Sequence, residues 1–158
     1  MHMQHEIALR EARTFIKSHY QMVLATYGDH PWTSTLYYSC DDELNLYFLS
    51  NPNTIHCQQL THNPSVAGAI SDSPQPPASP KKGLQLHGLA EEITSRHKIS
   101  HALSLWTKTL GVTDAAYSYE GMANKLITGR MYKITPHQFK FFNEELWEEG
   151  SEPMIAMR

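Results

Sequence analysis

The sequence predicts an α+β fold in which about six or seven strands form a small barrel packed by two or three helices. Three observations lead to this prediction. Segments in which apolar and polar side chains alternate outnumber the helical segments, and Gly, Pro and Asp turn signals divide them at short intervals. The length of 158 residues suits one domain, 1–158, with one core and no second globular unit.

Composition narrows the possible partners. Lys and Arg number 13 against 16 Asp and Glu, and the formal charge of -3 leaves no basic field for nucleic acid or an anionic membrane. Small molecules and other protein chains are the expected partners. Cys40 and Cys57 have no Cys-x-x-Cys spacing, so they are expected to be free thiols. The charged N-terminal stretch excludes a signal peptide, and a soluble cytoplasmic protein is expected.

The first half of the chain opens with a helix and continues with an antiparallel meander. Ile7, Ala12, Phe15 and Ile16 recur at helical spacing and predict an amphipathic helix from about His5 to His19. Gly28-Asp29-His30-Pro31 and Asp41-Asp42-Glu43 are turn signals that separate the segments after it. The predicted strands are Met22–Tyr27, Trp32–Cys40 and Leu44–Ser50.

The second half adds strands around one more helix. A four-proline loop follows a small-residue strand, and Ser95 and Gly111 are the expected caps of the helix. The strand after the proline loop is expected to turn Leu84, Leu86, Gly88 and Ala90 to one face. The expected order is a strand at Ser65–Ser71, the loop, a strand at 83–94, the helix at 95–111, a less regular region at 112–128, and two strands or one bent strand at 129–147 broken at Thr135-Pro136.

The stretch "SNPNTIHCQQLTHNP", Ser50 to Pro64, predicts a short helix between two Asn-Pro turns. Unpaired N–H groups at a helix N-terminus bind phosphate even without cationic side chains, and a threonine hydroxyl adds a donor. Thr54 and His56 are expected at the surface, at the start of this helix. The stretch therefore predicts a phosphate site, with a simple N-cap as the alternative role of Thr54.

The order of these pieces resembles the FMN-binding split barrel of the pyridoxamine 5'-phosphate oxidase superfamily. The resemblance rests on "LYFLSNPNTIHCQQLTHNPSVAGAI" and "GLQLHGLAEEIT", with a looser match at "GRMYKITPHQFKFF". In that family a strand ending in Thr or Ser leads through Ser-Arg-Lys into a helix, then to Leu, Asn-Pro and Gly-x-Ala-Glu. Here Ile55 replaces the family arginine and removes its bidentate phosphate contact. The sequence looks closest to an uncharacterised bacterial branch.

The resemblance implies an FMN-binding flavoprotein, an oxidoreductase acting on an unknown small substrate, with its site at a homodimer interface. Thr54 and His56 would hold the phosphate, and the strand at Thr35 to Tyr38 would hold the ring. Lys81 and Lys82 are candidates for the missing charge. Trp106, Tyr132 and Trp147 are candidates for an aromatic contribution from the partner. The cofactor-binding residues that the resemblance implies are Thr35, Leu36, Tyr37, Tyr38, Ser50, Thr54, His56, Lys82 and Trp106.

Two other classes of function remain open. One is a split barrel that holds haem, a deazaflavin or no cofactor. The other is a non-enzymatic ligand-binding or interaction domain, because fold alone does not imply activity. No catalytic residues are predicted, since FMN carries its own chemistry. His97 and His101 have a metal-ligand spacing, but no third ligand is signalled nearby, so no metal site is predicted.

Overall fold

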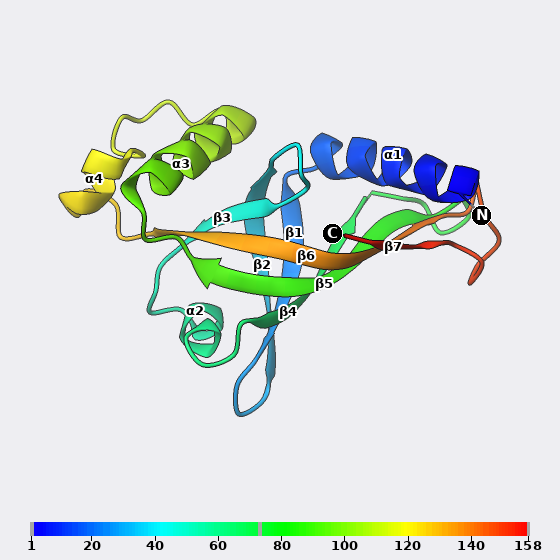
Figure 1. Ribbon diagram of the computed structural model, residues 1–158, viewed down its shortest axis with the longest axis horizontal. Helices are drawn as coiled ribbons and strands as arrows, with labels where there is room; N and C mark the ends of the chain where they lie inside the picture. Colours follow the sequence, from blue (N-terminus) through cyan, green and yellow to red (C-terminus); the bar gives the residue numbers. More distant parts are fainter. Residues whose placement is uncertain (1, 73, 158) are drawn as a thin grey trace.

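The computed structural model describes residues 2–72 and 74–157, within which seven strands form one antiparallel sheet. The sheet order is β3-β2-β1-β4-β5-β6-β7, and an additional pairing of β3 with β6 closes six strands into a barrel (Figure 1). The predicted α+β split barrel is confirmed. The strands are β1 Gln21–Tyr27, β2 Pro31–Cys40, β3 Leu46–Ser50, β4 Ser65–Ser71, β5 Lys82–Glu92, β6 Arg130–Asn143 and β7 Met154–Ala156.

Apolar side chains alternate along the strands and fill the barrel, as the period of two predicts. On β5 the predicted inward set is buried while Gln85, His87 and Leu89 point outward. One continuous core results. It includes Met22, Leu24, Tyr38, Phe48, Val66, Ile70, Leu84, Leu86, Ala90, Ile134, Phe139 and Phe141.

Two helices close the two ends of this barrel. Helix α1, His2–Ser18, lies across one end and contributes Ala12 and Ile16 to the core, and the Tyr38 hydroxyl donates to the Ile16 carbonyl at 2.7 Å. Helix α2, Ile55–Leu60, lies at the other end and adds Cys57 (Figure 1). The short helix that the sequence predicts between its two Asn-Pro turns therefore closes one end of the barrel.

Two further helices cover the outside of the sheet. Helix α3, Arg96–Leu110, and helix α4, Tyr119–Ala123, pack with Tyr47 and Met131 into a second apolar cluster. Gly111 ends α3 with a φ of 68°, which confirms the predicted C-cap. Helix α4 lies inside the region that was expected to be less regular. Within the described residues, no helix is both long and apolar enough to span a membrane.

Several strand boundaries differ in detail from the prediction, and β7 lies in a segment for which no strand was predicted. Strand β3 begins at Leu46 rather than Leu44, because Leu44 has a φ of 65° within a turn held by the Asp41 carboxylate, which accepts from the Asn45 amide. Of the two options for 129–147, the bent single strand is correct. Its register against β5 shifts between His87 and Gly88, where Pro136 lies opposite Gly88.

Gly88 is required by this bend. A Cβ atom added there would lie 2.3 Å from the Thr135 carbonyl oxygen and 2.8 Å from the Pro136 Cα. Both obstacles are backbone atoms, so no side-chain rotation can relieve them. The glycine of the Gly-x-Ala-Glu motif therefore allows β5 and β6 to approach at the bulge.

We expect Gly88→Ala to lower the free energy of unfolding by about 1–3 kcal/mol, because the new methyl group must push the two strands apart. Urea unfolding of both proteins measures this. Gly68→Ala is the matched control, since its Cβ would meet only the Leu86 side chain, at 3.2 Å, and the Val23 carbonyl oxygen, at 3.5 Å. Equal stability of Gly88→Ala and the native protein would contradict the assignment.

Candidate functional site

The barrel is split between β2 and β3. The two strands pair only from Tyr38 to Cys40, so from Pro31 to Tyr37 the edge of β2 that faces β3 has no strand partner, while its other edge pairs with β1. The Tyr38 amide donates to the Tyr20 carbonyl at 2.9 Å, on the side away from β3. Because backbone direction alternates along a strand, Thr33, Thr35 and Tyr37 direct their N–H and C=O groups into the gap. An open strand edge therefore lies along the split.

A single imidazole bridges this split at the end near α2. His56 Nδ1 lies 2.9 Å from the Ser34 hydroxyl on β2, and Nε2 lies 2.7 Å from the Ser50 hydroxyl at the end of β3. Nε2 also lies 3.2 Å from the Thr54 hydroxyl. The side chains of both separated strands and of the turn before α2 thus meet at one ring.

One tautomer of His56 makes all three ring contacts hydrogen bonds. The Thr54 hydroxyl donates its proton to the Asn51 carbonyl at 2.8 Å, so towards the imidazole it can only accept. We therefore assign the proton to Nε2, with Nδ1 accepting from the Ser34 hydroxyl. In this tautomer Ser50 also accepts from Nε2, and its O–H can donate to a ligand.

His56 is 7% exposed, whereas the sequence suggested a surface position. The ring turns inward because α2 plugs the barrel, which periodicity over six residues could not show. Burial lowers the pKa of His56 and keeps the ring neutral at physiological pH. Thr54 occupies the N-cap position of α2, yet its hydroxyl makes no bond to the helix amides. The capping alternative therefore does not describe this hydroxyl.

The remaining predicted cofactor residues lie in several environments. Thr35 and Tyr37 are exposed on the outer face of β2, while Leu36 is half-buried on the inner face. Tyr38 is a core residue held by α1. Trp106 is 8% exposed within its own chain, and its indole N–H donates to the Tyr37 carbonyl at the open edge, at 3.4 Å.

Lys82 lies at the opposite end of the barrel from α2. It follows the proline loop and its ammonium group forms an ion pair with Glu145 at 2.8 Å. Strand β4 begins near α2 at Ser65 and ends at Ser71, which pairs with Gly83, the residue next to Lys82. The length of β4 therefore places Lys82 and the end of the barrel near α2 roughly 20 Å apart. Within one chain, Lys82 is not part of the His56 cluster.

The other two aromatic candidates for a contribution from a partner are packed within their own chain. Tyr132 is 3% exposed and stacks on Phe48, with ring centroids 5.0 Å apart. Trp147 packs edge-on against Phe141. Both rings belong to the core of the chain that carries them.

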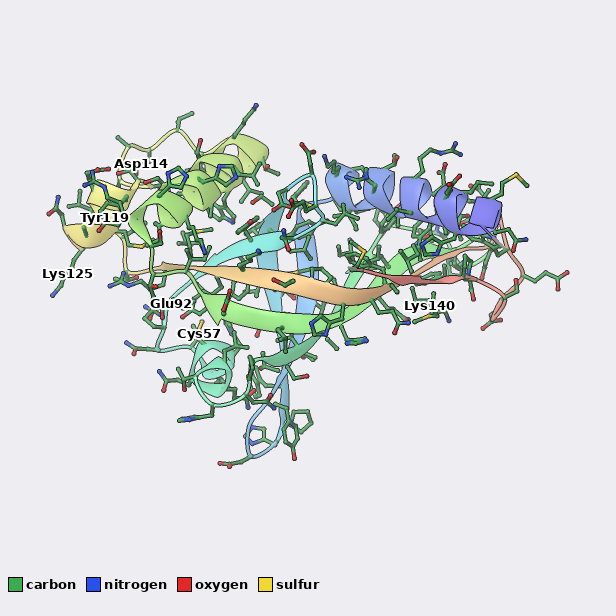
Figure 2. All side chains as sticks on the ribbon, viewed as in Figure 1. Cys57, Glu92, Asp114, Tyr119, Lys125 and Lys140 are labelled. Carbon is green, nitrogen blue, oxygen red and sulfur yellow. The ribbon has the colours of Figure 1, made fainter. Side chains whose placement is uncertain are left out.

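Arg130 is a site residue that the sequence reasoning missed. It begins β6 directly opposite Ser50 on β3, so the two side chains share a face of the sheet. The arginine lies inside the quoted "GRMYKITPHQFKFF", but only the pairing of β3 with β6 brings it beside the cluster. Tyr132, also on β6, contacts Cys57 of α2, and burial with this contact raises the pKa of its phenol. Figure 2 labels Cys57 and Glu92 at this end of the barrel.

One outer face of the sheet is bare. Helix α3 packs against β2, β3 and β6, whereas β1, β4 and the first half of β2 carry several small or apolar side chains that face outward. Val23 is 40% and Leu89 42% exposed. We call this surface the bare face; its residues are Val23, Ala25, Thr33, Thr35, Ala67, Ala69 and Leu89.

His97 and His101 line a separate cavity of about 480 Å³ beside the ends of β5 and β6. Lys98 and Lys133 share it with Glu91 and Glu92. Among residues 2–72 and 74–157, no group of three or more His, Cys, Asp or Glu side chains is arranged to hold a metal ion. The histidine pair therefore lies in a cavity of mixed charge.

Comparison with known proteins identifies the family of this chain. Residues 8–141 match the family model described as pyridoxamine 5'-phosphate oxidase. The chain belongs to this family. A family relative, a UPF0306 protein of Haemophilus ducreyi, is 24% identical over 143 residues, which cover 87% of this chain and 93% of the relative.

Solved structures of low sequence identity share the fold of this family member. A conserved hypothetical protein of Mycobacterium tuberculosis superposes with a TM-score of 0.71 at 16% identity, covering 90% of this chain and 92% of that one. A haem-binding protein of Mycobacterium smegmatis superposes with a TM-score of 0.72 at 17% identity, covering 94% of this chain and 57% of that one. At these identities the likeness concerns the fold.

The buried imidazole predicts a pH dependence of stability. The folded pKa of His56 lies below its unfolded value of about 6.5, so the unfolded chain binds more protons below that pH. The contribution of neutral His56 is complete above about pH 6.5 and is lost as the pH falls toward the folded pKa.

Urea unfolding between about pH 5 and pH 8 measures this dependence. We expect the native protein to lose more stability toward acid pH than His56→Gln, which does not titrate. His62→Gln, at an exposed loop position, is the control for the same substitution. Parallel pH profiles for His56→Gln and the native protein would show that the imidazole is not the titrating group.

Proposed function

We propose that this protein is a flavoprotein that binds FMN along the split between β2 and β3. The observation that carries the proposal is the open edge of β2 beside the His56 cluster. A flavin ring is planar and carries hydrogen-bonding groups along one side, which the backbone N–H and C=O groups of Thr33 and Thr35 at the open edge are suited to bind. The cluster at Ser50 and Thr54 would hold the phosphate.

The side chains at the cluster fit a phosphate group. The Ser50 hydroxyl has a free O–H, because its oxygen accepts from His56 Nε2. Thr54 has no bond to the first amides of α2, so those N–H groups retain donor capacity for the same ligand. His56 acts here by orienting the hydroxyl of Ser50 rather than by its charge, since its ring is neutral and buried.

FMN, when bound, supplies transfer of a hydride or of single electrons. The chain's own residues would bind and orient it and exclude water from one side of the ring. This accounts for a site with hydroxyls and a positioned imidazole but no predicted general acid or base. The proposed activity is an oxidoreductase acting on a small substrate.

We also propose that the working form is a homodimer joined through the bare face. The outward side chains of Val23, Ala67 and Ala69 are small or apolar and lie in register across β1 and β4. Such a flat surface suits a second sheet. It adjoins the open edge of β2 through Thr33 and Thr35, so a partner seated there would cover the flavin site.

Flavin titration tests the site. The native protein is expected to show flavin absorption bands after purification or saturable quenching of FMN fluorescence. Ser50→Ala is expected to weaken FMN binding about tenfold, which is the usual effect of losing one hydrogen bond to a charged group. Ser100→Ala, at an exposed position on α3, is the matched control and should bind normally. No saturable binding by the native protein would contradict the proposal, and a Soret band on titration with haemin would favour the haem alternative.

Sedimentation equilibrium tests the dimer. Ala69→Arg places a charge at the centre of the bare face and is expected to give a monomer that binds FMN more weakly. Ser104→Arg, on the exposed side of α3, introduces the same charge elsewhere and should remain dimeric. A monomeric native protein, or a dimeric Ala69→Arg variant, would argue against this interface.

A further inference from the structure

Arg130 is a half-buried cation without a carboxylate partner among the described residues. One guanidinium N–H donates to the adjacent Gly129 carbonyl at 3.1 Å. An arginine has five N–H donors, so four have no acceptor within the described parts of the chain. Partly buried charges are normally paired, because desolvation is costly.

The position of Arg130 in the sheet brings these N–H donors beside the His56 cluster. Directly opposed residues of antiparallel strands have Cβ atoms about 5 Å apart. Arg130 and Ser50 form such a pair across β6 and β3. A contact just beyond this pair also links the two chain segments: the Asn51 side-chain amide donates to the Thr128 hydroxyl at 3.4 Å.

We propose that Arg130 is the cationic anchor of this site and binds the anionic group of the ligand together with the Ser50 hydroxyl. The proposal rests on the proposed function for the identity of that group, which in FMN is the phosphate. A guanidinium forms bidentate bonds to phosphate, and Ser50 adds a third donor from the facing strand.

This assignment accounts for the absence of a cation at the start of α2. Ile55 is 45% exposed and offers no donor from its side chain. Lys82 is engaged with Glu145 at the far end of the barrel. Arg130 stands opposite Ser50 across β6 and β3, so in this proposal the positive charge comes from β6 instead of from the helix.

A purely structural role for Arg130 makes a different prediction. Arg130 acts electrostatically on the Tyr132 phenol, as does Glu92 on the neighbouring strand. If the arginine only balanced this local charge, its replacement would lower stability and affect every ligand equally. An anion anchor affects only ligands that carry the anion.

The experiment compares FMN with riboflavin, which has the same ring system but no phosphate. Arg130→Met is expected to weaken FMN binding about 10- to 100-fold, measured by fluorescence titration, and to leave riboflavin binding unchanged. Lys133→Met is the matched control: it removes one charge from a half-buried position on the same strand, three residues away and on the other face of the sheet. It should bind both ligands normally.

The outcomes separate the two proposals. If the native protein binds FMN and Arg130→Met binds it equally well, or loses FMN and riboflavin alike, Arg130 is not the anchor while the flavin function stands. If the native protein binds neither flavin, the flavin function fails, and thermal stabilisation by inorganic pyrophosphate decides the anchor. Stabilisation of the native protein and of Lys133→Met, but not of Arg130→Met, would then support it; no difference between the variants would overturn it.

Discussion

The interruption of β2–β3 pairing after Tyr38 is the constraint on which the site depends. A continuous ladder would satisfy the backbone of both strands and leave no edge for a ligand. Here β3 pairs with β6 along its whole length, and before Tyr38 strand β2 keeps only β1 as a neighbouring strand. His56 holds the two separated strands at a fixed distance by bonding to Ser34 on one and Ser50 on the other. The gap between β2 and β3 is therefore held in place by specific side-chain contacts.

Neutrality of the bridging imidazole follows from its burial and has a consequence for the electrostatics of the site. Among the described residues no carboxylate contributes to the pKa of His56, so none would balance a protonated ring, whose Nδ1 could no longer accept from the Ser34 hydroxyl. A positive charge for an anionic ligand would then come from another group. In the proposal that group is Arg130, while His56 orients the hydroxyls.

The family connection and the bare face agree with the proposed function. The family includes FMN enzymes, and the same fold occurs in a haem-binding protein. Fold alone does not decide activity, so the chemistry depends on the side chains at the site. In this chain hydroxyl groups lie at the split, Arg130 lies opposite Ser50, and alanines and Val23 lie on the outer face. The proposed site and interface rest on these features.

The sequence by itself determined strands β1 to β6 to within a few residues, the short helix between Asn-Pro turns and the inward faces, because period and turn chemistry are local properties. It also determined that Ser50, Thr54 and His56 belong together, since they lie within one turn of chain. It predicted neither β7 nor α4. Only the tertiary structure decided that His56 is buried, that Lys82 lies at the far end, and that Arg130 stands opposite Ser50. Each of these depends on which distant strands pair, and strand pairing is set by long-range closure of the barrel rather than by neighbours in the sequence.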